Sequence, residues 1–223
     1  MFHLSLLYFH YLSTMKTIAA TFLLILFASC HNNSSTSQTK QEITNAIVKE
    51  LATIEAQSPD SILLETSLKV LEAIKKEDYE KLTFYIHPTK GIRFSPYAYV
   101  DTTEDVVIKQ TSFTTSFSDN YFWGSYDGSG ESINLTTKDY FKQFVYNADF
   151  LHAEKVGINK MIGVGNSLNN LTEVYPNSVY TEHHFSGFNP AYEGMDWTSL
   201  RLVYEKLDGE LFLVGIIHDQ WTI

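Results

Sequence analysis

The stretch DWTSLRLVYEKLDGELFLVGIIHDQWTI, residues 196–223, carries the strongest fold signal of the chain. Asp208 and Gly209 stand between two runs rich in apolar, β-branched and aromatic residues, which is typical of a type I′ turn because both turn residues need a positive φ. The stretch therefore predicts a hairpin with strands at 197–206 and 210–221. In the second strand both alternating faces are apolar: Phe212, Val214 and Ile216 on one, and Leu211, Leu213 and Ile217 on the other. We expect this strand to be central and covered on both sides.

The residues before the hairpin predict helices first and strands later. Ile43, Ile47, Leu51 and Ile54 indicate an amphipathic helix at 42–55, and Leu64, Leu68 and Leu71 a second one beginning near Asp60 or Ser61. A third short helix is expected at 78–86, and strands at 92–94, 106–108, 121–126 and 178–185, with one helix inserted near 136–145. This order predicts one α+β domain over residues 42–223, in which N-terminal helices pack on a curved antiparallel sheet that ends in the long hairpin.

Two resemblances support this layout. The element order and the ending EKLDGELFLVGI, residues 205–216, resemble the nuclear transport factor 2-like (cystatin-like) superfamily over about residues 62–223. That resemblance implies a cone-like sheet with the helices in its concave face. Residues 82–100 and 196–223 also look like stretches of uncharacterised bacterial envelope lipoproteins. Neither resemblance implies a catalytic residue.

The N-terminal residues predict export. MKTIAATFLLILFASC, residues 15–30, has one lysine, an apolar run too short to cross a bilayer, and small residues before its cysteine, as in a secretory signal peptide. We assign residues 1–29 to this signal peptide and interpret 1–14 as a mis-assigned start. The string LFASC resembles the lipobox of bacterial lipoproteins, which implies that Cys30 carries lipid and becomes the mature N-terminus. The alternative is one uncleaved membrane anchor over residues 1–29.

The residues after Cys30 predict a tether. HNNSSTSQTKQ, residues 31–41, contains no apolar residue and cannot bury enough surface to offset the entropy of ordering it. Residues 30–41 thus form a lipidated cysteine with a flexible linker. We expect an extracytoplasmic domain held by lipid on a bacterial membrane, which is the outer membrane if the cell has one.

Composition and motifs exclude several classes of function. The chain has 26 acidic and 16 basic side chains, a formal charge of −10, so we expect no nucleic acid partner. Cys30 is the only cysteine, which excludes an internal disulfide, and its lipidation would leave no thiol nucleophile. The sequence contains no GxSxG, HExxH or P-loop string. These observations predict a domain without a cofactor and favour a non-enzymatic role.

Histidine and acidic clusters give weak metal signals. His183 and His184 are neighbours in a predicted strand, so they point to opposite faces and cannot share an ion. His87, one of this pair and His218 can meet across strands, but buried histidines satisfied by hydrogen bonds are the more common case. The loop YDGSGE, residues 126–131, begins like a calcium loop, yet Ser132 replaces its glycine and Lys138 its last glutamate. We predict no metal site.

Aromatic residues make up 14% of the chain and suggest a ligand pocket inside the curved sheet. The predicted ligand-binding residues are Arg93, Tyr97, Trp123, Tyr126, Asp127, His183 and His218. Arg93 is the first to test, because a cation between apolar neighbours needs a carboxylate or a ligand oxygen. The alternative interpretation is that the aromatic side chains only fill the core.

Three functions remain open on the sequence alone. The leading one is a membrane-anchored envelope lipoprotein whose non-enzymatic domain binds a small ligand, a glycan or an envelope protein. The fold resemblance also allows an isomerase- or dehydratase-like enzyme, with Tyr97, Asp127, His183 and Asp219 as candidate participants that no spacing singles out. A third is a structural interaction module.

Overall fold

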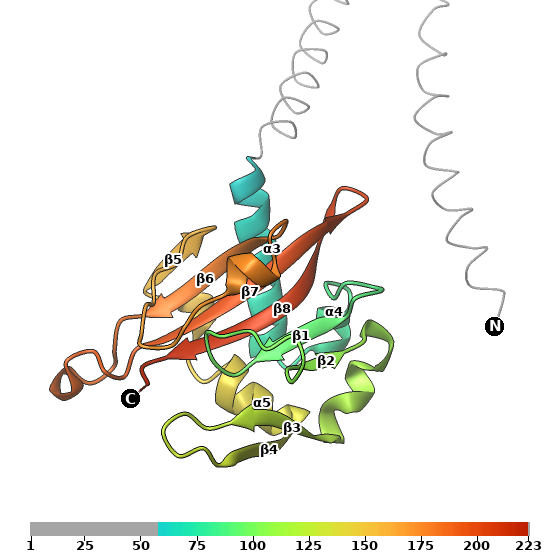
Figure 1. The fold of residues 1–223 in the computed structure, drawn as a ribbon. Coiled ribbons are helices and arrows are strands. Elements are labelled where there is room, and N and C mark those ends of the chain that lie inside the picture. The colour runs from blue at the N-terminus through green and yellow to red at the C-terminus, as the bar shows by residue number, and fades with distance from the viewer. Residues whose placement is uncertain (1–57, 223) are drawn as a thin grey trace, which may run out of the picture. The chain divides into compact units, whose positions relative to one another are not determined.

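The structure is a computed structural model that describes residues 58–222 of the 223-residue chain. It is an α+β fold built on a six-stranded sheet with the strand order β2-β1-β8-β7-β6-β5 (Figure 1). The predicted lipidation at Cys30, the tether at 31–41 and the helix at 42–55 lie outside the described residues. Within residues 58–222 no helix is long and apolar enough to cross a membrane.

Within the described residues two helices come first, and strands then predominate, with short helices and helical turns between them. The sheet consists of β1 (Ile92–Ser95), β2 (Val106–Ile108), β5 (Lys155–Ile158), β6 (Val179–Phe185), β7 (Thr198–Leu207) and β8 (Glu210–Gln220). A separate hairpin pairs β3 (Asn120–Ser125) with β4 (Ser132–Thr136), and the helices are α3 (Pro59–Lys75), α4 (Tyr79–Thr83), α5 (Thr137–Tyr140) and α6 (Leu171–Val174). A π-helical turn, Phe141–Val145, continues α5, and 3-10 turns lie at Gln110–Ser112, Thr114–Ser118, Phe150–His152 and Pro190–Tyr192.

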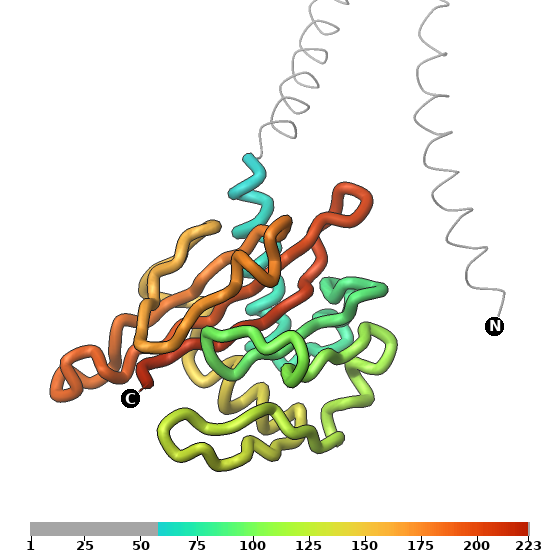
Figure 2. The backbone as a smooth tube through the Cα atoms, in the orientation of Figure 1, coloured from blue at the N-terminus to red at the C-terminus, as the bar shows by residue number. Residues whose placement is uncertain are grey.

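The C-terminal hairpin is confirmed. Asp208 and Gly209 connect β7 to β8 with φ values of 53° and 89°, the two positive angles that a type I′ turn requires. Strand β8 lies between β1 and β7, so it is central, and both of its faces are covered. Figure 2 follows this hairpin, in red, as the longest pair of neighbouring strands in the domain.

The prediction of which β8 residues share a face is partly wrong, because the strand contains a β-bulge. Val203 pairs with Gly215 and Tyr204 with Leu213, which leaves Val214 as an extra residue on β8. The bulge changes which residues share a face. Leu213 and Ile216 enter the main core beneath α3, whereas Val214 and Ile217 belong to a second apolar cluster on the opposite face of the sheet.

The sheet is mixed, whereas the sequence predicted an antiparallel one. Strand β1 runs parallel to β8, with Arg93 opposite Gly215 and Ser95 opposite Ile217. A parallel pair needs a long crossover between its strands, and here nearly the whole domain forms that connection. Because residues 96–209 separate β1 from β8, no short turn sets the direction of β1 relative to β8. The local sequence pattern therefore could not predict that the two strands run parallel.

Helix α3 covers one face of the sheet. Its N-cap is Ser58, whose hydroxyl accepts from the Ser61 backbone N–H at 3.1 Å, rather than the expected Asp60 or Ser61. Of the predicted apolar stripe only Leu71 is buried, because the helix turns a face containing Leu63, Val70, Leu71 and Ile74 toward the core. In its middle, the Ser67 hydroxyl accepts from the Thr181 hydroxyl of β6 at 2.9 Å.

Candidate functional site

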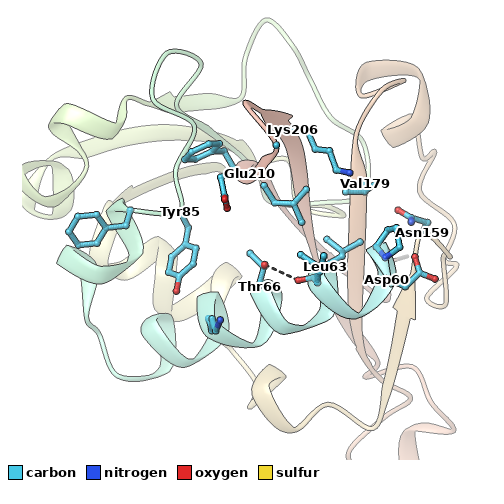
Figure 3. Close-up of a pocket in the computed structure, with 15 residues that line it drawn as sticks. Asp60, Leu63, Thr66, Tyr85, Asn159, Val179, Lys206 and Glu210 are labelled. Atoms are coloured by element: carbon cyan, nitrogen blue, oxygen red, sulfur yellow. Dashed lines mark hydrogen bonds between the residues drawn. The ribbon is translucent and has the colours of Figure 1, made fainter. Parts of the chain in front are cut away.

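A cleft of about 450 Å³ lies between α3 and the tip of the β7–β8 hairpin (Figure 3). Helix α3 supplies Ile62, Thr66 and Lys69, which recur at helical spacing and therefore share one side of the helix. The start of β8 supplies Glu210, Leu211 and Phe212 to the opposite wall, and Phe84 and Tyr85 close one end. None of these residues was predicted from the sequence to belong to a site.

Backbone hydrogen bonds hold the closing end of the cleft in place. The Leu213 N–H donates to the Tyr85 carbonyl at 2.7 Å, and the His87 N–H donates to the Leu213 carbonyl at 3.0 Å. Ile86 thus forms a short parallel bridge with Leu213. The segment after α4 is fixed to β8 in this way, which keeps Tyr85 next to the start of that strand.

The cleft combines an apolar lining with unpaired polar groups. Leu63 is buried, whereas Ile62 is 42% exposed and Phe84 is 77% exposed at the rim. Within residues 58–222, the side chains of four polar lining residues make no hydrogen bond or ion pair: Asp60, Tyr85, Lys206 and Glu210. Lys69 differs from them because it is paired with Glu65 at 2.7 Å. Such a mixture of apolar surface and free polar groups is the usual character of a ligand site.

Arg93, the first predicted ligand-binding residue, lies in another groove, on the sheet face opposite α3. Its Nη1 donates to the Asp101 and Asp105 carbonyls at 3.1 and 3.3 Å. Burial raises the pKa of the nearby Asp105 carboxyl to about 6, although hydrogen bonding from Ser95 and the charge of Arg93 oppose the shift. Arg93, the cation between apolar neighbours, therefore already donates hydrogen bonds to oxygen atoms of the domain itself.

The other cations of this groove are also paired. Lys90 forms an ion pair with Glu205, and Lys109 donates to the carbonyl oxygens of Thr89 and Lys90 at 3.0 and 3.2 Å. The groove has a volume of about 600 Å³, but its cations already have protein partners. The cleft beside α3, where the side chains of Asp60, Tyr85, Lys206 and Glu210 have no partner within residues 58–222, is therefore the better candidate site.

Four of the predicted residues come together by packing around one phenylalanine. The Phe144 ring lies 6.1 Å from the rings of Tyr97 and Tyr126 and 5.6 Å from the ring of His218. The backbone N–H of Asp127 donates to the Tyr97 hydroxyl at 3.0 Å, which joins the β3–β4 hairpin to this cluster. None of these residues lines the cleft beside α3.

Trp123 is a core residue. It is 1% exposed, its ring stacks on Tyr140 with centroids 3.9 Å apart, and its indole N–H donates to the Leu135 carbonyl at 2.9 Å. The indole is thus fully engaged inside the domain.

The two predicted site histidines are buried on the α3 side of the sheet. His183 lies 3.2 Å from the Thr181 hydroxyl through Nε2, and its Nδ1 has no hydrogen-bond partner within residues 58–222. His218 donates through Nδ1 to the Pro96 carbonyl at 2.9 Å and lies 3.1 Å from the Thr198 hydroxyl. Burial lowers the pKa of each imidazole to about 4, so both are neutral at physiological pH.

His184 points to the opposite face, as the strand alternation predicts, and its Nδ1 lies 2.8 Å from the Ser199 hydroxyl. In the described part of the chain no three His, Cys, Asp or Glu side chains are placed to hold a metal ion.

Arg201, Glu182 and Asp219 form a buried ionic network that was not predicted from the sequence. Arg201 of β7 is 0% exposed and lies between Glu182 of β6 and Asp219 of β8. Its Nη2 donates to Asp219 Oδ2 at 2.8 Å and to the Gly163 carbonyl at 2.9 Å, and its Nε lies 3.2 Å from Glu182 Oε2. Burial raises the pKa of the Asp219 carboxyl against the opposing charge of Arg201. One sequence feature could have indicated this network: each of the predicted strands 178–185, 197–206 and 210–221 carries one of these three charged residues among apolar ones.

The candidate catalytic residues do not share a site. Asp127 is exposed on the turn between β3 and β4, and Tyr97 accepts from its backbone. His183 lies on the α3 face of the sheet, whereas Asp219 lies on the other face with Arg201.

Comparison with known proteins identifies no family. No family model and no curated protein matches the chain. Among solved structures, a DUF4783 family protein from Bacteroides ovatus ATCC 8483 is 9% identical, over 68% of this chain and 92% of that one, with a TM-score of 0.28. An NTF-2 like protein of unknown function from Shewanella oneidensis MR-1 is 10% identical, over 73% of this chain and 100% of that one, with a TM-score of 0.31. TM-scores this low do not establish a shared fold, so the α+β class rests on the described elements themselves.

Proposed function

We propose that this chain is a bacterial envelope lipoprotein, anchored through lipid on Cys30, whose domain binds a ligand in the cleft between α3 and the β7–β8 hairpin without catalysing a reaction. The anchor is supported by the signal-peptide pattern at residues 15–30 and by the lipobox-like LFASC string. The formal charge of −10 would repel anionic lipid, so the acyl chains rather than the domain surface hold the protein at the membrane.

The contrast between the cleft and the rest of the domain carries the binding proposal. Arg93, His218 and Arg201 each have hydrogen-bond or ion-pair partners inside the domain. The cleft instead combines exposed apolar side chains with polar groups that have no partner within residues 58–222. Its volume of about 450 Å³ falls in the range of small-molecule sites.

A binding role fits the titratable groups better than a catalytic one. Catalysis by an acid and a base needs tuned groups that reach the same substrate. The histidines with lowered pKa values, His183 and His218, lie outside the cleft and are buried. No specific observation favours the isomerase-like alternative.

The anchor is tested by mass spectrometry of residue 30 in protein recovered from fractionated cells. We expect a lipid-modified cysteine in the membrane fraction, and a Cys30→Ser variant released from it. An unmodified thiol in cytosolic protein contradicts the proposal.

The cleft is tested by native mass spectrometry of the full chain extracted from its own membrane. Thr66→Trp places an indole in the cleft, so we expect it to lose the ligand that the wild type carries. Thr115→Trp is the matched control, because Thr115 is exposed on a 3-10 turn and, like Thr66, bonds a nearby backbone carbonyl. Equal ligand loads on both variants contradict binding in the cleft.

A further inference from the structure

We infer that the cleft selects a cationic amine with an aromatic or other apolar body, with Glu210 as the counter-ion. This inference rests on the proposed function, since it names the ligand class of the same cleft.

Glu210 is a carboxylate without a cation. No hydrogen bond or ion pair connects it to any residue in 58–222. Lys69 is held by Glu65 on the same helix at 2.7 Å, whereas Lys206 forms no ion pair within the described part of the chain. Figure 3 shows Lys206 directed toward Val179, away from Glu210, while the carboxylate of Glu210 is directed into the cleft. A cationic ligand would supply the positive charge next to Glu210 that no described residue supplies.

Aromatic side chains line the same cleft. Phe84 is 77% exposed, and Tyr85 and Phe212 are half-buried in the lining. Aromatic faces attract ammonium groups, and their effect adds to that of a nearby carboxylate. Leu63 and Leu211 add apolar surface to the lining, against which an uncharged ligand body can be buried.

An anionic ligand fits this environment poorly. It would approach Glu210 and Asp60, two carboxylates without partners among the described residues, on a chain of formal charge −10. Lys206 alone opposes them within the lining, because Lys69 is already paired. The local and the overall charge therefore both favour a cation.

The test compares three ligands of similar shape: phenethylammonium, phenethyl alcohol and hydrocinnamate. Their affinities for the full chain are measured by ligand-observed NMR titration. We expect the ammonium to bind about five-fold more tightly than the alcohol, as a partly exposed ion pair allows, and hydrocinnamate to bind most weakly. Glu210→Gln should remove most of the preference for the ammonium over the alcohol without weakening the binding of the alcohol. Glu173→Gln, an exposed carboxylate in α6 on the opposite face of the sheet, should leave the preference unchanged.

The outcomes separate this inference from the proposed function. Equal binding of all three ligands, abolished by Thr66→Trp, overturns the cationic preference and leaves binding in the cleft intact. Tightest binding of hydrocinnamate, or a preference for the ammonium that is undiminished in Glu210→Gln, also overturns the inference. If none of the three binds, the inference fails, whereas the proposed function is still decided by the ligand that co-purifies with the wild type.

Discussion

Replacement of Arg201 by methionine should destabilise the domain more than most single substitutions. Arg201 is 0% exposed, and its Nη2 lies 2.8 Å from Asp219 Oδ2 and 3.3 Å from Glu182 Oε1. Methionine fills much of the volume but leaves two carboxylates in the interior without their cation. Removing one partner of a buried ion pair costs about 3–5 kcal/mol, so we expect the free energy of unfolding to fall by that amount at neutral pH.

In Arg201→Met the unfavourable burial of an unpaired charge should affect Asp219 more than Glu182. Glu182 still accepts from the backbone N–H groups of Ile162 and Gly163, both at 2.8 Å. The Oδ2 atom of Asp219 loses its ion-pair partner, and its Oδ1 has no hydrogen-bond partner within residues 58–222. An uncompensated buried carboxylate responds by taking up a proton.

The penalty should therefore depend on pH. Burial already raises the pKa of Asp219 above its unfolded value, and the opposing effect of Arg201 disappears in the variant. A carboxyl with a raised pKa in the folded state destabilises the fold as pH rises through the window between its two pKa values, and has no such cost below the unfolded one. The difference between wild type and Arg201→Met should be largest near neutrality and shrink toward about pH 4.

Urea unfolding of the full chain over this pH range checks the reasoning. The control is the neutral variant Arg201→Met with Glu182→Gln and Asp219→Asn, which should recover much of the lost stability because no buried charge remains. A penalty for Arg201→Met below about 1 kcal/mol at neutral pH, or one that does not narrow in acid, would refute the account.

Three further predictions concern packing and ionisation. Gly163→Ala should cost about 1–3 kcal/mol in chemical unfolding, because its Cβ would lie 2.5 Å from the Ser199 hydroxyl oxygen, and an added Ser199→Ala should restore part of the loss. Asp149→Asn should lower thermal stability slightly above about pH 4, where hydrogen bonds from its neighbours hold the Asp149 pKa below its usual value, and the difference should vanish in stronger acid. The imidazole resonances of His183 and His218 should show no titration in NMR above about pH 5, because burial lowers both pKa values to about 4; titration of either near its ordinary value would contradict its burial.

The parts of the fold that follow from local rules were predictable. The Asp208–Gly209 turn, the central position of β8 and the opposite faces of His183 and His184 depend only on turn chemistry and on the two-residue repeat of a strand. The α+β class follows from the order of such elements along the chain. Of the predicted site residues, Tyr97, Tyr126 and His218 do meet, around Phe144, but outside the cleft.

The cleft and the ionic network depended on contacts that no local pattern encodes. His218 bonds to Pro96, 122 residues away in the sequence, and β1 joins β8 in parallel beside it. The bulge at Val214 reverses the faces of β8 near the hairpin, and the position of α3 against β6 decides which side chains border the cleft. By itself the sequence determined the hairpin and the class of fold, because each depends on the pattern of neighbouring residues. Only the tertiary structure decided which charges are neutralised and which stay free, because that depends on partners brought from distant parts of the chain.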